Sequence, residues 1–77
     1  MKYYAELTDT FGGEANYSWC DRHEISIEAG ASELAIVRAA KAALGISGCR
    51  CKREDWGETI TLKPYGSLTI AFITPIY

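Results

Sequence analysis

The sequence predicts an α+β domain in which one helix packs on a four- to five-stranded antiparallel sheet, in the order β-β-α-β-β-β. Three observations favour this fold: period-two alternation near both ends of the chain, one helical apolar stripe between them, and a length of 77 residues. The composition, 48% apolar and 23% charged, is typical of a globular chain rather than a disordered one. We therefore expect residues 1–77 to form one domain.

Two strands joined as a hairpin are expected first. Residues 2–8 alternate between apolar and mostly polar side chains, which indicates a half-buried strand. A second alternation covers residues 15–28, and a straight strand of that length, at about 3.3 Å per residue, would be too long for this domain. We therefore expect a bend or bulge near Cys20–His23.

The segment between these strands, residues 8–14, has the composition of a loop. Gly12 and Gly13 permit positive φ, and Asp9 and Thr10 are expected to cap the loop amides. Phe11 is expected to turn inward and anchor the loop.

Trp19 has two possible environments. It shares the parity of Ile25 and Ile27, which favours a core position, as strand tryptophans are highly buried on average. Beyond a bulge that parity would reverse, and Tyr17 and Trp19 would then form an exposed binding platform.

Residues 30–44 predict the single helix. Ser32 is a suitable N-cap, Gly45 stands where a left-handed terminator belongs, and Ile46 can fold back on the last turn. The expected buried stripe consists of Ile36, Val37, Ala40, Ala43 and Leu44.

The remaining chain predicts three short strands. Residues 49–54 alternate, residues 55–57 suggest a hairpin turn, and residues 59–63 follow as its second strand. Residues 67–74 are apolar on both parities, which is typical of a central strand. Pro75 is expected to end that ladder, leaving the tail at an edge or frayed.

No motif in the sequence predicts catalysis or a cofactor. The one histidine, His23, would need a sharp bend to reach Cys20, and nothing marks an oxyanion hole. Zinc would require Cys20, His23, Cys49 and Cys51 together, but Cys-x-Cys is an uncommon spacing for it, and Cys20 and His23 face opposite sides of a strand. We expect no metal, with Cys49 and Cys51 as small core residues and Cys20 as a half-buried thiol.

Charge is distributed unevenly along the chain. Residues 1–37 carry two basic side chains against seven acidic ones, and residues 38–77 carry six basic against three acidic. An acidic first half could meet a basic surface on a target protein, where opposite potentials speed association. The candidate partner-binding residues are Glu6, Asp9, Glu14, Tyr17, Asp21, Glu24 and Glu28.

A second possibility is a small nucleic-acid-binding module. Basic residues beside an aromatic side chain can bind phosphates and stack a base, and the candidates are Arg50, Lys52, Arg53 and Trp56. Three bases are few for strong phosphate binding, and the net charge of −2 opposes it. The alternative role of these charges is to protect an edge strand from pairing.

Residues 7–20 contain the segment DTFGGEANYSW. This stretch resembles small phage and prophage proteins in which an N-terminal strand leads into a similar segment, often followed by basic residues. Here Cys20-Asp21-Arg22-His23 follows, which departs from that pattern by including an acid. The resemblance implies a mobile-element origin and carries no catalytic residue.

By analogy of class, the resemblance suggests a non-enzymatic phage accessory protein of the anti-CRISPR type. Such a protein would inhibit a host defence complex, with a CRISPR effector as the specific expectation, by protein–protein contact in the bacterial cytoplasm. The odd number of cysteines, three, fits that reducing compartment, and no apolar run is long enough to cross a membrane.

Overall fold

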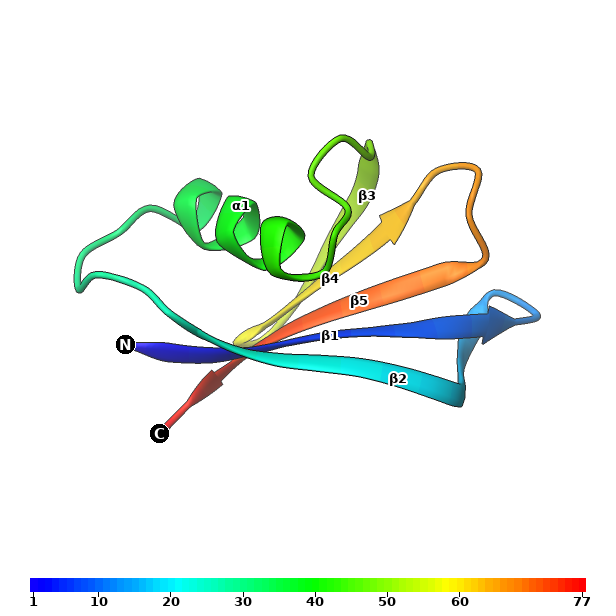
Figure 1. Ribbon diagram of the computed structural model, residues 1–77, viewed down its shortest axis with the longest axis horizontal. Helices are drawn as coiled ribbons and strands as arrows, with labels where there is room; N and C mark the ends of the chain where they lie inside the picture. The colour runs from blue at the N-terminus through cyan, green and yellow to red at the C-terminus, as the bar shows by residue number, and fades with distance from the viewer.

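The computed structural model describes all 77 residues and contains one helix and one antiparallel sheet. The strands lie in the spatial order β2-β1-β5-β4-β3, and α1 crosses one face of the sheet (Figure 1). The elements are β1 (Lys2–Phe11), β2 (Glu14–Ser26), α1 (Glu33–Ala43), β3 (Cys51–Trp56), β4 (Thr59–Pro64) and β5 (Thr69–Ile76). The α+β class and the element order predicted from the sequence are confirmed.

The helix begins where its N-cap requires. The Ser32 side chain accepts a hydrogen bond from the Ala35 N–H at 3.2 Å, which satisfies one of the free amides of the first turn. Gly30 has a φ of +82° and Ser32 is extended, so α1 starts at Glu33 and the expected start at Gly30 is wrong by three residues.

A Schellman motif ends the helix. Gly45 has a φ of +73°, its N–H donates to the Ala42 carbonyl at 3.2 Å, and the Ile46 N–H donates to the Lys41 carbonyl at 2.9 Å. Ile46 then packs on the core. The predicted terminator is confirmed.

The core lies between α1 and the sheet face that the helix covers. On β1 this face carries Ala5, and small residues there let the helix approach closely. The eight buried core residues are Ala5, Ile36, Ala40, Leu44, Ile60, Leu62, Ala71 and Ile73. The predicted helical stripe is confirmed at Ile36, Ala40 and Leu44, and Val37 packs against the same cluster.

β5 is central, as predicted, but its bounds differ from those expected. It lies between β1 and β4, and Ile70, Ala71 and Ile73 are buried. Leu68 precedes the strand and is exposed, so the expected strand start at residue 67 is wrong by two residues. The ladder also continues past Pro75, because pairing with β4 ends at Ile73 and the proline has only β1 beside it.

The hairpin between β1 and β2 is tighter than the sequence suggests. β1 continues to Phe11, and only Gly12 and Gly13, with φ of +63° and +84°, form the turn. Phe11 is the last residue of β1, and the hairpin end of β1 lies far from α1 in Figure 1. Its side chain is 80% exposed, so the expected inward position is wrong.

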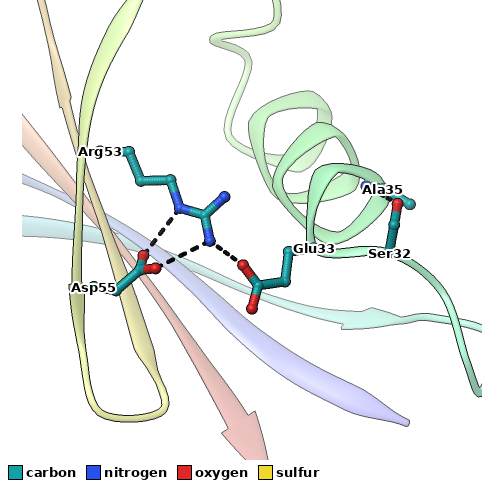
Figure 2. A network of polar contacts seen from close by, with 5 residues as sticks. All are labelled: Ser32, Glu33, Ala35, Arg53 and Asp55. Atoms are coloured by element: carbon teal, nitrogen blue, oxygen red, sulfur yellow. Dashed lines mark hydrogen bonds and ion pairs between the residues drawn. The ribbon is translucent and has the colours of Figure 1, made fainter.

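An ion-pair network joins the start of α1 to β3. Arg53 donates from Nε to Asp55 at 2.9 Å and from its terminal nitrogen to Asp55 at 3.2 Å and to Glu33 (Figure 2). Arg53 is opposite Leu62 in the β3–β4 register, which places it on the helix-covered face. The network therefore connects the two layers at their rim.

Ile73→Ala tests the packing of the core. Ile73 is fully buried at the centre of the sheet, so the substitution removes buried methyl groups and leaves a cavity. We expect the free energy of unfolding to fall by about 2 to 5 kcal/mol, measured by urea denaturation. Leu34→Ala, on the exposed side of α1, is the matched control and should change stability by less than about 1 kcal/mol. Equal losses in the two variants would contradict this core.

Candidate functional site

Four residues of β2 leave the sheet between its two paired parts. Thr8 pairs with Cys20 and Thr10 pairs with Ala15, so residues 16–19 stand opposite the single residue Asp9. We call Asn16–Trp19 the aromatic bulge. The position near Cys20–His23 that the strand length predicts for this irregularity is wrong, because the ladder is regular from Cys20 to Ser26.

The Asp9 carboxylate holds one side of the aromatic bulge. It accepts hydrogen bonds from the Ser18 N–H at 2.9 Å, the Ser18 hydroxyl at 2.6 Å and the Asn16 side-chain amide at 2.9 Å. The bonds from Ser18, and then that from Asn16, hold the pKa of Asp9 well below its usual range. Asp9 is therefore a capping residue, but it caps the aromatic bulge and not the expected loop at residues 8–14, which is paired strand and a two-glycine turn.

Thr8, rather than Thr10, is the second capping residue. Its hydroxyl accepts from the Tyr17 N–H at 3.1 Å and donates to the Trp19 carbonyl at 2.8 Å. Thr8 is on the sheet face away from α1, since its neighbour Leu7 packs toward the core. The bulge backbone covers that side chain completely, so Thr8 is fully buried there.

The backbone of the aromatic bulge is strained at Tyr17. This is the one residue other than glycine with a positive φ, +55°, in the left-handed region that L-residues enter at a cost. Strain of this kind persists only where surrounding contacts over-determine it, and Thr8 and Asp9 provide those contacts.

The two aromatic side chains of the bulge are in solvent. Tyr17 is 58% exposed and Trp19 is 45% exposed. The favoured core position of Trp19 is therefore wrong, because the bulge interrupts the alternation that would have aligned it with Ile25. The alternative, an exposed pair of aromatic residues, describes the structure.

The sheet face opposite α1, which we call the open face, has no second layer. It contains a shallow hollow of about 430 Å³, lined in part by Glu14, Trp56, Lys63 and Phe72. Trp56 is 70% exposed at its wall. A hydrogen bond from Lys52, and then the charge of Lys63, lower the pKa of the neighbouring Glu54 carboxyl.

The acidic candidates are not gathered into one site. Glu6 and Glu24 are on the open face, and Asp21 is on the other face, 3.0 Å from His23. Glu14 lines the hollow and Glu28 lies in the segment after β2. The Asp9 carboxylate is already bound by Asn16 and Ser18 of the bulge. Of the partner-binding candidates, Tyr17 is therefore the one that lies in the bulge with an exposed side chain.

The basic candidates are also separated. Arg53 is on the helix-covered face, where Asp55 and Glu33 bind it. Lys52 and Trp56 are on the other face, with Lys52 3.4 Å from Glu54. Arg50 precedes β3, so no single surface of the structure combines all four residues.

The structure contains no cluster of three or more metal-ligating side chains. Cys49 is exposed and lies before β3, so its predicted core position is wrong, whereas Cys51 packs against the core. Cys20 is exposed rather than half-buried. Its Sγ is 3.7 Å from Glu6, and local desolvation and that carboxylate raise the pKa of the thiol.

The sequence contained a signal for the bulge that the strand pattern obscured. Asp, Asn, Ser and Thr compete with sheet hydrogen bonding by binding nearby backbone groups, and Thr8, Asp9, Asn16 and Ser18 all lie close to the hairpin. Alternation of Tyr17 with Trp19 pointed to a continuous strand. Pairing the polar residues of β1, Thr8 and Asp9, with those of β2, Asn16 and Ser18, would have located the bulge.

Asp9→Asn tests the charge at the bulge. Because the pKa of Asp9 is lowered in the folded chain, its carboxylate stabilises the fold above the ordinary value of about 4, and this contribution is lost as the pH falls below that value. We expect the thermal midpoint of the variant to be lower than wild type at neutral pH, with the difference shrinking below about pH 4. Glu28→Gln removes a carboxylate elsewhere and is the control. If the thermal midpoints of Asp9→Asn and wild type differ by the same amount from neutral to acid pH, the stabilising role of the Asp9 carboxylate is contradicted.

The chain was compared with known proteins by sequence and by structure. No protein-family model, curated protein or solved structure matches it. No helix of the structure has the length and apolar character needed to span a membrane. The resemblance of residues 7–20 to phage proteins stays a prediction.

Proposed function

We propose that this chain is a non-enzymatic binding protein that anchors on a protein partner through the aromatic bulge. The observation that carries the proposal is the way Tyr17 and Trp19 are held. The Thr8 hydroxyl binds the Tyr17 N–H and the Trp19 carbonyl, and Asp9 binds the Ser18 N–H between them, yet both aromatic side chains are exposed. A fold that needed these aromatic residues only for stability would bury them.

The chemistry of the bulge suits protein recognition. Tyrosine and tryptophan supply a large contact area with few rotatable bonds, and they are enriched among the residues that dominate binding energy. A bulge backbone that is already fixed loses little further conformational entropy on binding. Both features favour a preformed anchor over a loop that orders on contact.

We further propose that the partner is a host defence complex and that the chain inhibits it, as an anti-CRISPR protein of phage or prophage origin. One expectation and one observation support this proposal. The expectation is the resemblance to phage proteins predicted for residues 7–20, a range that includes the whole bulge. The first half of the chain is also acidic, which suits a target that has a basic, nucleic-acid-binding surface.

Trp19→Ala and Tyr17→Ala test the anchor. The assay expresses the chain in bacteria whose CRISPR system restricts a phage and measures plaque formation, with affinity for the purified effector measured in parallel. We expect wild type to restore plaques, and each variant to lose about 2 kcal/mol or more of binding, roughly 30-fold in Kd. Thermal midpoints should stay close to wild type, because both side chains are exposed.

Trp56→Ala is the matched control, since Trp56 is the other tryptophan, is exposed, and belongs to β3 rather than to the bulge. It should inhibit as wild type does. A Trp19→Ala chain that inhibits normally would show that the bulge is not the anchor. A wild-type chain that restores no plaques would reject the defence target, and binding of oligonucleotides in place of protein would favour the basic residues instead.

A further inference from the structure

We propose that a second copy of this chain pairs with the free edge of β2, so that two sheets join into one. This inference is independent of the proposed function, because it rests on a different part of β2. The strand has a single neighbour, β1, so the backbone groups on its other side have no partner in the sheet (Figure 1). An exposed edge of this kind is a template for another strand.

The regular part of the β2 edge is suited to pairing with a second copy about a two-fold axis. Its ladder with β1 runs over the seven residues Cys20–Ser26, and the aromatic bulge ends it on one side. Two copies of one strand pair antiparallel about a two-fold axis that lies between them. Opposed side chains share a face only if this axis lies midway between the two copies of a single residue, which we call the residue at the axis. An axis at His23, the central residue, overlaps all seven residues.

This register is complementary in charge. With the axis at His23, Arg22 stands opposite Glu24 of the second copy, and Glu24 stands opposite its Arg22, giving two ion pairs on the open face. Cross-strand pairs of opposite charge stabilise a sheet, and like charges directly opposite destabilise it. An axis at Arg22 or at Glu24 would oppose two like charges.

The side chains involved are already placed on that face. Arg22 lies over the Tyr4 ring at 3.7 Å, and Glu24 is 3.2 Å from Lys2, so both are held beside the edge. On the opposite face His23 is 3.0 Å from Asp21, which supplies a carboxylate beside each imidazole at the axis.

The other edge strand, β3, is less complementary in charge to a second copy of itself. β3 has six residues, and an axis at Arg53 or at Glu54 places like charges opposite each other. The geometry therefore favours β2, and the product is a sheet of ten strands, five from each copy.

Charge reversal at the edge tests this register by analytical ultracentrifugation. Arg22→Glu gives an edge with two acids and Glu24→Arg gives one with two bases, so each variant opposes like charges across the axis. We expect wild type to sediment as a dimer, each variant to shift its dimer dissociation constant upward by at least about 10-fold, and an equimolar mixture of the two to form a heterodimer. Lys52→Glu makes the same charge change as Arg22→Glu on the β3 edge and should dimerise as wild type does.

Three results would overturn the proposal: a wild-type chain that stays monomeric at every concentration, an Arg22→Glu variant as dimeric as wild type, or a mixture that fails to associate. Far-UV circular dichroism establishes that each variant is folded. Should a single variant fail to fold, the double variant R22E/E24R decides, because it exchanges the charges and restores complementarity. A dimeric double variant supports the register, and a monomeric one contradicts it.

Discussion

The hydrogen bonds made by Thr8 and Asp9 determine where β2 leaves the sheet. Four residues of β2 stand opposite one residue of β1, so the backbone of the bulge cannot use the ladder, and these two side chains replace it. They also hold Tyr17 in a backbone conformation that it would not adopt alone. The exposure of Trp19 and the length of the regular edge beyond it both follow from this one local arrangement.

The single helix determines which parts of the sheet are covered and which remain exposed. α1 covers one face of the sheet, and its start is joined to β3 by Arg53 with Glu33 and Asp55 (Figure 2). The open face and both sheet edges remain uncovered. Along the β2 edge, Arg22 and Glu24 are spaced so that they can pair with a second copy about an axis at His23. A domain this small thus keeps two different surfaces available, an aromatic one at the bulge and a charged one along β2.

Features that depend on neighbours along the chain were predictable from the sequence. The cap at Ser32, the terminator at Gly45 and the buried stripe of α1 each follow from residues a few positions apart. The bulge was not placed correctly, because it depends on Asp9 meeting Ser18 from the opposite strand. The prediction that Phe11 turns inward was wrong for a similar reason. Its burial depended on how far the helix reaches across the sheet, and alternation alone does not encode that.

Amide hydrogen exchange measured by NMR tests the central claim, that Thr8 and Asp9 hold the bulge rigidly. The Tyr17 N–H is bonded to Thr8 at 3.1 Å and the Ser18 N–H to Asp9 at 2.9 Å, although both residues are exposed. We expect these two amides to exchange far more slowly than those of the hairpin turn at Gly12 and Gly13. Exchange of Tyr17 and Ser18 at the rate of an unstructured chain would contradict it.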